Sequence, residues 1–315
     1  MRQRTRRTAM ALGGFLLLLL LPAVLPSFYL GLVTEVLIFG LFAMSLNLLL
    51  GYGGLPSLGH AAYFGVAGYT VALLSFTVTQ NGWLLIFLGL AMAGVTAALF
   101  GLLALRTRGD YFLMITLALG EVLWGLAFKL RSLTHAEDGI SGVARPVLNL
   151  PWSFEDDVAF YVFVLVSVTL ATLLLILIIE SPFGKAVVGV RENEARLQVL
   201  GYNVWLCRYL AFVLAGLFGG LAGILFIFYN RFVSPADLSV ILSAKALLMV
   251  ILGGAGTLAG PMIGAALLVF IENEVSSLTE RWLLILGLIY VVVVMFIPAG
   301  VYGGLKAKLQ RRSAV

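Results

Sequence analysis

Residues 158–179 read Val-Ala-Phe-Tyr-Val-Phe-Val-Leu-Val-Ser-Val-Thr-Leu-Ala-Thr-Leu-Leu-Leu-Ile-Leu-Ile-Ile, and none of them carries a charge. An α-helix needs about 20 predominantly apolar residues to cross the hydrocarbon core of a membrane, and this run is long enough. Comparable apolar runs recur along the chain. They have the length of helices rather than the alternating pattern of about ten residues found in outer-membrane strands, which favours a helical bundle over a barrel.

The composition of all 315 residues agrees with an integral membrane protein. Hydrophobic residues make up 62% of the chain and charged residues 11%, and the mean hydropathy is +1.08. A soluble domain carries about 25% charged residues, more than twice this share, so soluble enzymes, nucleic-acid-binding proteins and disordered proteins are disfavoured. Cys207 is the only cysteine, which excludes an intrachain disulfide and a cysteine-based metal cluster.

The charged residues are grouped, and the groups predict the orientation of the chain. Basic clusters at 2–7, 106–108, 185–208 and 306–312 hold most of the 20 Lys and Arg, and each flanks an apolar run. The segment between Lys129 and Val158 is rich in acidic residues instead. By the positive-inside rule, the basic clusters face the cytoplasm and this segment, with a loop at about 131–157, faces outward.

About ten crossings follow from the apolar runs and from alternation between the two sides. They cover residues 9–28, 30–50, 56–79, 83–105, 111–130, 158–179, 206–229, 241–255, 258–273 and 282–300. The 51–60 and 241–260 regions are short and rich in Gly, so re-entrant or broken helices fit them equally well. The predicted fold class is all-α: one polytopic inner-membrane bundle over 1–315, with about 8–10 transmembrane or re-entrant helices and both termini in the cytoplasm.

The N-terminus also has the form of a signal peptide, because Arg2–Arg7 precedes the apolar Leu16–Leu21. Pro22, Val24 and Pro26 follow in place of an Ala-x-Ala cleavage site, and the next apolar run starts almost at once. We therefore expect a retained first helix.

The 35 glycines predict close helix packing, since small residues let helix backbones approach each other in a membrane. Several lie four residues apart and so share a helix face: Gly216/Gly220, Gly219/Gly223, Gly256/Gly260/Gly264 and Gly300/Gly304. Such faces pack either within this chain or between two chains, and the spacing alone does not separate these alternatives.

The sequence contains no motif for catalysis or for nucleotide binding. Gly184-Lys185 is followed by Ala186 and has no upstream Gly, so it is not a phosphate-binding G-x-x-x-x-G-K-[ST] loop, and any ATP has to be bound by a partner. There is no H-E-x-x-H, no Cys/His cluster and no nucleophile elbow. His60 and His135 are isolated, and we predict no enzyme activity, cofactor or metal site.

Ionisable residues within apolar runs are expensive to bury and often mark a transport path. Glu35, Glu121 and Lys245 occupy such positions. Glu35 lies near the outer end of its run, and Lys245 lies close enough to a helix end for its side chain to reach outward. Glu121 lies in the middle of its run and should face the interior of the bundle.

The segment between Glu180 and Arg208 predicts an amphipathic helix at the cytoplasmic face. Residues 181–184 (Ser-Pro-Phe-Gly) break the preceding helix, and Lys185 to Leu200 mixes charges with apolar residues at helical spacing. Residues 201–203 (Gly-Tyr-Asn) end it. Such a helix either rests on lipid headgroups or docks on a soluble motor subunit.

Five stretches together resemble the branched-chain amino acid (LivM/LivH-type) ABC transporter permeases, and the LivM-like half most closely. These stretches are Ser45–Gly65, Asp110–Glu121, Glu137–Gly142, Ser181–Asn203 and Leu252–Gly264. They occur in the family's order and span nearly the whole chain.

The resemblance implies a permease that pairs with a second, similar permease, two cytoplasmic ATPase subunits that bind the ATP, and an extracytoplasmic binding protein. The family's coupling segment falls on Arg191, Glu192, Asn193, Glu194, Arg196 and Gly201. Two departures stand out: Gly201 comes one residue late relative to the importer Glu-Ala-Ala…Gly loop, and Lys245 stands where the family commonly has an acidic or polar residue. Relatives are associated with branched-chain amino acids, urea, short amides and aromatic acids, so the substrate stays open.

Polar residues of the Gly-rich stretches are the candidates for lining a path, because broken helices aim backbone groups at a substrate. The candidates are Asn47, Ser57, His60, Thr116 and Glu121. The alternative for each is a helix–helix hydrogen bond, which contributes about 0.6 kcal/mol inside membranes. The competing functions are a self-sufficient channel or secondary carrier for a small solute, and a purely structural membrane subunit, neither of which needs ATPase partners.

Overall fold

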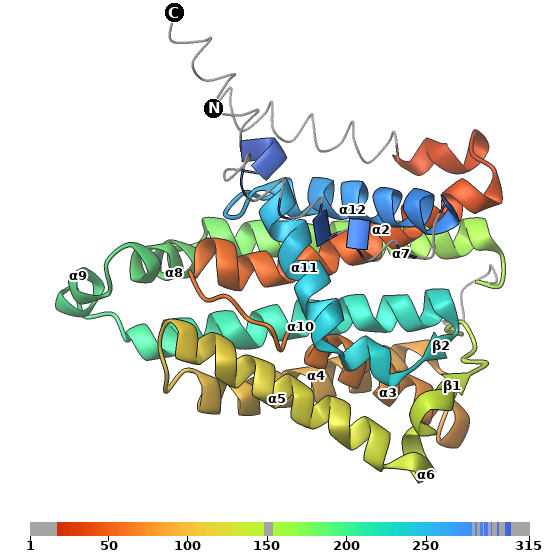
Figure 1. Cartoon of the computed structure of the whole chain (residues 1–315), viewed down its shortest axis with the longest axis horizontal. Coiled ribbons are helices and arrows are strands. Elements are labelled where there is room, and N and C mark those ends of the chain that lie inside the picture. The colour runs from red at the N-terminus through yellow and green to blue at the C-terminus, as the bar shows by residue number, and fades with distance from the viewer. Residues whose placement is uncertain are drawn as a thin grey trace, which may run out of the picture.

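The computed structural model describes residues 18–147 and 154–278 without a gap, together with scattered positions from 281 to 303. Most of the predicted crossings over 9–28 and 282–300 therefore lie outside the described residues. The described part is built from helices, which confirms the all-α class (Figure 1). Five helical segments are long and apolar enough to cross a membrane: Ser27–Tyr52, Gly82–Ala104, Asp110–Lys129, Asp157–Glu180 and Val204–Asn230.

The elements follow the predicted crossings in order. After the short η1 (Leu21–Ala23), the first half contains α2 (Ser27–Asn47), which continues as one π-helical stretch η2 (Leu48–Tyr52), then α3 (Ala61–Thr77), α4 (Gly82–Ala104) and α5 (Asp110–Lys129). The middle contains α6 (Arg131–Thr134), η3 (Ala136–Asp138) and β1 (Ile140–Ser141). The second half contains α7 (Asp157–Glu180), α8 (Pro182–Glu192), α9 (Glu194–Val199), α10 (Val204–Asn230), β2 (Phe232–Val233), η4 (Pro235–Leu238), α11 (Val240–Gly253) and α12 (Gly260–Leu278).

Short polar side chains start most of the helices after α3. Each accepts a hydrogen bond from a backbone N–H of the first turn, which satisfies a group that the helix itself leaves unpaired. The capping residues are Asn81 for α4, Asp156 for α7, Ser181 for α8, Asn193 for α9, Asn203 for α10 and Ser239 for α11.

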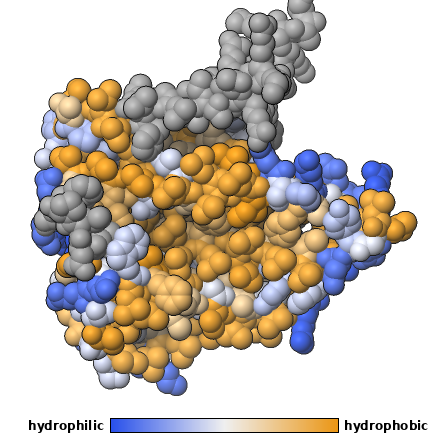
Figure 2. Space-filling model, turned by 180° about the vertical axis from the view of Figure 1, so that it is seen from behind, coloured by the Kyte–Doolittle hydropathy of each residue, from blue (hydrophilic) through white to orange (hydrophobic). Residues whose placement is uncertain are grey.

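The two ends of the bundle carry different charges, as the sequence predicts. We name the end with α8, α9 and the 105–109 connection the basic end; an ion pair joins Arg108 to Glu194 there at 3.1 Å. The opposite end, with β1, β2 and the start of α7, is the acidic end, where β1 pairs antiparallel with β2. These ends lie at opposite sides of the molecule in Figure 1, and Figure 2 shows a broad apolar surface between them.

Helix α10 forms the centre of the bundle, and its glycines let α3 and α4 approach closely. A methyl group added at Gly216 would lie 2.3 Å from the Ala97 Cβ of α4, and one at Gly220 would lie 2.4 Å from the Ala93 Cβ. At Gly223 it would lie 2.1 Å from the Phe64 carbonyl oxygen of α3. These glycine pairs therefore pack within the chain, as does Gly264 against Met249. Gly304 lies outside the described residues.

Replacing Gly223 by Ala should destabilise the bundle, because the new methyl group meets the backbone of α3, which cannot rotate away. Overpacking of this kind costs about 1–3 kcal/mol. We expect the melting temperature of the protein in mild detergent to fall by several degrees. Gly125→Ala is the matched control, since a methyl group on that α5 residue meets nothing within 4 Å; equal melting temperatures for the two variants would contradict this packing.

Candidate functional site

Two helices, α3 and α11, begin partway along the bundle; Ala61 at the start of α3 is fully buried, whereas Ile241 in the first turn of α11 is exposed on the lateral surface. Residues 53–60 follow η2 and enter from the basic end without regular structure, so the structure shows the broken-helix alternative that the sequence left open for 51–60. The other connecting segment, residues 231–239, contains β2 and η4, follows α10 and enters from the acidic end. The two helix starts meet, because the Ala61 N–H donates a hydrogen bond of 2.9 Å to the Ser243 Oγ. We name this point the central junction.

Buried polar groups surround the central junction. The Ser45 hydroxyl donates to the Phe42 carbonyl at 2.6 Å and also lies 2.8 Å from the His60 Nε2. Because that hydroxyl has a single proton, Nε2 is the donor of the second bond, and the His60 Nδ1 is left as an acceptor. Among the described residues, this Nδ1 and the Ser57 Oγ are buried without a hydrogen-bond partner.

Helix α5 closes one side of the central junction. The Leu58 N–H donates to the Thr116 Oγ1 at 3.3 Å, and the Thr116 hydroxyl donates to the Leu113 carbonyl at 2.9 Å. Gly59 makes this approach possible, because a methyl group there would lie 2.1 Å from the Thr116 carbonyl oxygen. The irregular segment therefore packs directly against the backbone of α5.

The structure brings three of the five candidate path residues together: Ser57, His60 and Thr116. Glu121 lies five residues beyond Thr116 on α5, half-buried, and no hydrogen bond joins it to a described residue. Asn47 lies elsewhere, at the basic end. Sequence reasoning missed Ser45 and Ser243, since a single Ser in an apolar helix carries no signal of its partner.

The central junction is fully enclosed and lies where two helices begin. Two helix N-termini meet there, and each carries partial positive charge, although the Ala61 N–H is already bonded to Ser243 and the Leu242 N–H to Ser239. Ser57, His60, Thr116 and Ser243 are all 1% exposed or less. In this conformation the junction is therefore sealed from both ends of the bundle.

Asn47 and Arg191 join three segments at the basic end. The Asn47 side chain donates to the Thr257 carbonyl at 2.8 Å and accepts from the Gly256 N–H at 2.9 Å, which ties α2 to the loop between α11 and α12. The Arg191 guanidinium of α8 donates to the Gly51 carbonyl at the end of α2. Its stem lies against Gly54, where the positive φ of +68° favours Gly.

Helix α9 is held by its acidic first residue. Glu194 forms ion pairs with Arg108 at 3.1 Å and with Arg208 of α10 at 3.0 Å. The prediction of a single amphipathic helix from Lys185 to Leu200 was wrong. Asn193 adopts an extended backbone conformation and starts α9 as a separate helix.

The remaining coupling candidates surround this break. Asn193 accepts from the Arg196 N–H at 3.0 Å, whereas the side chains of Glu192 and Arg196 are exposed. Gly201 follows α9 with a φ of +85°, and a methyl group added there would meet no atom within 4 Å. The backbone conformation, rather than lack of space, therefore favours Gly at this position.

One of the three charged residues predicted within the apolar runs, Lys245, points in a direction that the sequence did not predict. Lys245 does not reach outward to the membrane surface; its ammonium pairs with Glu272 of α12 and lies 4.4 Å above the centre of the Phe39 ring. Sequence reasoning did not single out Glu272, because it lies near the end of its apolar run. Glu35 of α2 lies beside this pair.

Comparison with known proteins identifies a family. The profile of the family described as "Branched-chain amino acid transport system / permease component" matches residues 28–296. The high-affinity branched-chain amino acid transport system permease protein LivM of Escherichia coli is 29% identical over 289 residues, which cover 85% of this chain and 68% of LivM. LivH of the same organism is 25% identical over 284 residues, covering 84% of this chain and 91% of LivH.

A shorter match extends to sugar transport. The ribose import permease protein RbsC of Haemophilus influenzae is 30% identical over 104 residues, covering 31% of this chain and 32% of RbsC. No solved structure matches the chain. Because the family profile spans all the crossings that the structure describes in full, from α2 to α12, this chain belongs to the permease components of branched-chain amino acid transport systems.

Proposed function

We propose that this chain is the permease subunit of an ATP-binding-cassette importer for branched-chain amino acids or a related small polar solute. The observation that carries the proposal is the central junction, where two broken helices from opposite ends of the bundle meet. Transporters place substrate sites at such breaks, near the middle of the membrane. The converging N-termini suit a carboxylate, which branched-chain amino acids carry.

The charge distribution supports an orientation in the bacterial or archaeal inner membrane. The basic end faces the cytoplasm, both termini lie on that side, and the acidic end faces outward. The binding protein then delivers solute at the acidic end, and the ATPases act at the basic end. The chain itself needs no cofactor, because the partner subunits bind and hydrolyse ATP.

The second permease docks, in this proposal, on the lateral surface of α5. This helix closes the central junction on one side and exposes large apolar residues on the other, among them Tyr111, Met114 and Val122. A path between the two permeases would pass Glu121, which lies half-buried at the edge of that surface. Membrane lipid covers the remaining lateral surface.

The ATPase subunit docks on α8 and α9, and two contacts transmit its motion. Glu194 links α9 to α10 and to the start of α5 through Arg208 and Arg108. Arg191 links α8 to the end of α2, where the irregular segment toward the central junction begins. Displacement of these helices would therefore move the elements that seal the junction.

The proposal is tested by purifying the tagged chain in mild detergent and identifying the subunits that co-elute. We expect a second permease and two ATPases, with ATP hydrolysis stimulated by a loaded binding protein and leucine uptake into proteoliposomes that requires ATP. A chain that purifies alone and moves solute down a gradient would instead be a channel or carrier.

Glu194→Gln should uncouple hydrolysis from transport, because it removes the carboxylate charge shared by two arginines while keeping the shape of the side chain. We expect ATP-driven uptake to fall at least five-fold, with assembly and ATP hydrolysis retained. Glu180→Gln is the control, since Glu180 is an exposed carboxylate at the same end of the bundle. Equal uptake by both variants would argue against transmission through α9.

Ser57→Ala should slow transport without destabilising the protein, because the Ser57 hydroxyl has no described partner to lose and is free to bind substrate. One such hydrogen bond contributes about 0.5–1.5 kcal/mol, which corresponds to a roughly 2- to 10-fold lower uptake rate at saturating binding protein. Ser75→Ala is the control, because the Ser75 hydroxyl of α3 bonds only the carbonyl of Ala72 in its own helix. A lower melting temperature with unchanged uptake would show that Ser57 is only structural.

A further inference from the structure

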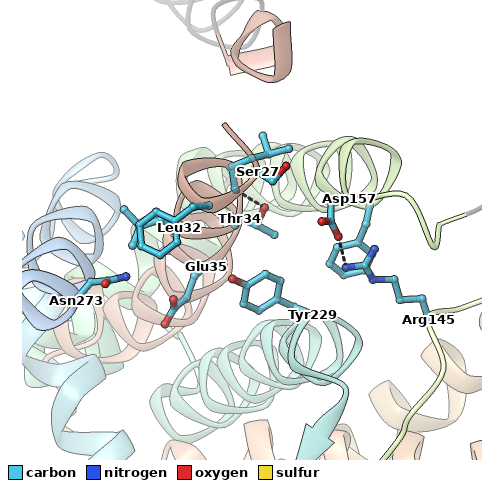
Figure 3. A pocket seen from close by; sticks show the side chains of 12 residues that line it. Ser27, Leu32, Thr34, Glu35, Arg145, Asp157, Tyr229 and Asn273 are labelled. Carbon is cyan, nitrogen blue, oxygen red and sulfur yellow. Dashed lines mark hydrogen bonds and ion pairs between the residues drawn. The ribbon is translucent and has the colours of Figure 1, made fainter. Parts of the chain in front are cut away.

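A cavity of about 280 Å³ with a mixed polar and apolar lining opens at the acidic end, away from the central junction. It lies between the first turns of α2 and α7, the last turn of α10 and the outer part of α12. Figure 3 shows the polar side chains that line it, among them Glu35, Tyr229 and Asn273 together with the pair formed by Arg145 and Asp157. A cavity of this size holds several water molecules or one small solute.

The Arg145 charge in this cavity is already compensated. One guanidinium nitrogen of Arg145 donates to Asp157 at 2.7 Å, and the other donates to the carbonyls of Phe154 and Glu155 at 2.9 Å each. The guanidinium also lies 4.5 Å above the centre of the Phe160 ring. The ion pair with Asp157 offsets the Arg145 charge, although the buried Nε of Arg145 has no hydrogen-bond partner among the described residues.

Glu35 is the carboxylate without a counter-charge. It lies eight residues into α2, about 12 Å along the helix axis from its start, where an isolated charge is costly. Within the described part of the chain, no hydrogen bond or ion pair joins its side chain to another residue. The hydroxyl of the neighbouring Thr34 does not serve it, since that hydroxyl donates to the Leu30 carbonyl at 2.8 Å.

The nearest cation is held by another acid. Lys245 interacts electrostatically with Glu35, but its ammonium forms its ion pair with Glu272. With both carboxylates ionised, the three side chains from α2, α11 and α12 carry two negative charges and one positive charge. The cluster lacks one positive charge, and the cavity that reaches Glu35 is open to the acidic end.

Neutral oxygen atoms complete the surroundings of Glu35. The Tyr229 hydroxyl and the Asn273 side-chain amide line the same cavity, and no described hydrogen bond engages either of them. Figure 3 shows the Tyr229 hydroxyl directed toward the Glu35 side of the cavity. A carboxylate with hydroxyl and amide oxygens is the ligand set that hard cations and ammonium groups prefer.

We propose that this cavity binds one small monovalent cation, an alkali ion or an ammonium ion, through Glu35 with the oxygens of Tyr229 and Asn273. The cation supplies the missing positive charge of the cluster and holds α2, α10 and α12 together at the acidic end. Lys245 stands two residues from Ser243 of the central junction, so occupancy of this site bears on the position of α11. The proposal does not depend on which solute the permease moves.

The test measures the melting temperature of the full chain in lipid nanodiscs at constant pH and ionic strength. Sodium, potassium and ammonium chloride are compared with N-methyl-D-glucamine chloride, which supplies a bulky organic cation at the same ionic strength. We expect at least one small cation to raise the melting temperature by about 3 °C or more in a saturable manner. The three salts distinguish the alkali ions from ammonium.

Glu35→Gln should abolish this response, because it removes the charge while keeping the shape of the side chain. In N-methyl-D-glucamine chloride, the Glu35→Gln variant should melt at or above the melting temperature of the wild type, since the uncompensated charge is gone. Glu180→Gln, at the opposite end of the bundle, should keep the wild-type response. A response that persists in Glu35→Gln, or a wild-type protein that responds to no small cation, would overturn the proposal.

Two further measurements cover the remaining outcomes. If Glu35→Gln does not fold, Tyr229→Phe serves in its place, because it removes one ligand oxygen. We expect the half-saturating cation concentration to rise several-fold in this variant. An unchanged concentration would count against the site. The melting temperature could instead depend on pH and on no small cation, and this pH dependence could disappear in Glu35→Gln. That result would mean that a proton neutralises Glu35, and it would reject the proposed cation site. Neither result bears on uptake, so the proposed transport function is tested separately.

Discussion

The hydrogen bond between the Ala61 N–H and the Ser243 hydroxyl illustrates the constraint on which the whole bundle depends. A lipid environment offers no water to backbone groups, so a helix that starts inside the membrane must satisfy its first N–H groups within the protein. Here α3 and α11 start face to face, and side chains of α5 and α11 accept from residues 58 and 61. The connecting segments are tolerated because neighbouring helices cover them: α5 packs against residues 58 and 59, and α3 and α5 pack against η4.

That enclosure requires unusually close contacts between backbones, and glycine provides them. Gly223 places α10 against the Phe64 carbonyl of α3, and Gly59 places the irregular segment against the Thr116 carbonyl of α5. Side chains at these positions would open the space around the central junction to lipid or water. The glycine content that looks unfavourable for helices in water is thus the condition for burying broken ones in a membrane.

Sequence reasoning predicted the crossings well because each rests on local apolar length, and it predicted the two ends because charge clusters flank the crossings. It grouped five polar residues of the Gly-rich stretches, and only three of them, Ser57, His60 and Thr116, lie together in the structure. It missed Ser45 and Ser243, whose roles arise from partners 15 and 182 residues away in the sequence. The outward direction predicted for the Lys245 side chain rested only on its distance from a helix end. Its ion pair with Glu272 depends instead on how α11 packs against α12.

The short helix α11 connects the polar sites of the bundle. Its first turns carry Ser243 of the central junction and Lys245 of the acidic-end cluster, and its last residue leads into the loop that Asn47 binds. A helix of 14 residues is about 21 Å long and moves as a rigid body in a packed core. A displacement that begins at Arg191, against Gly51 and beside that loop, would therefore reach the central junction through α11 without a chain of separate side-chain rearrangements.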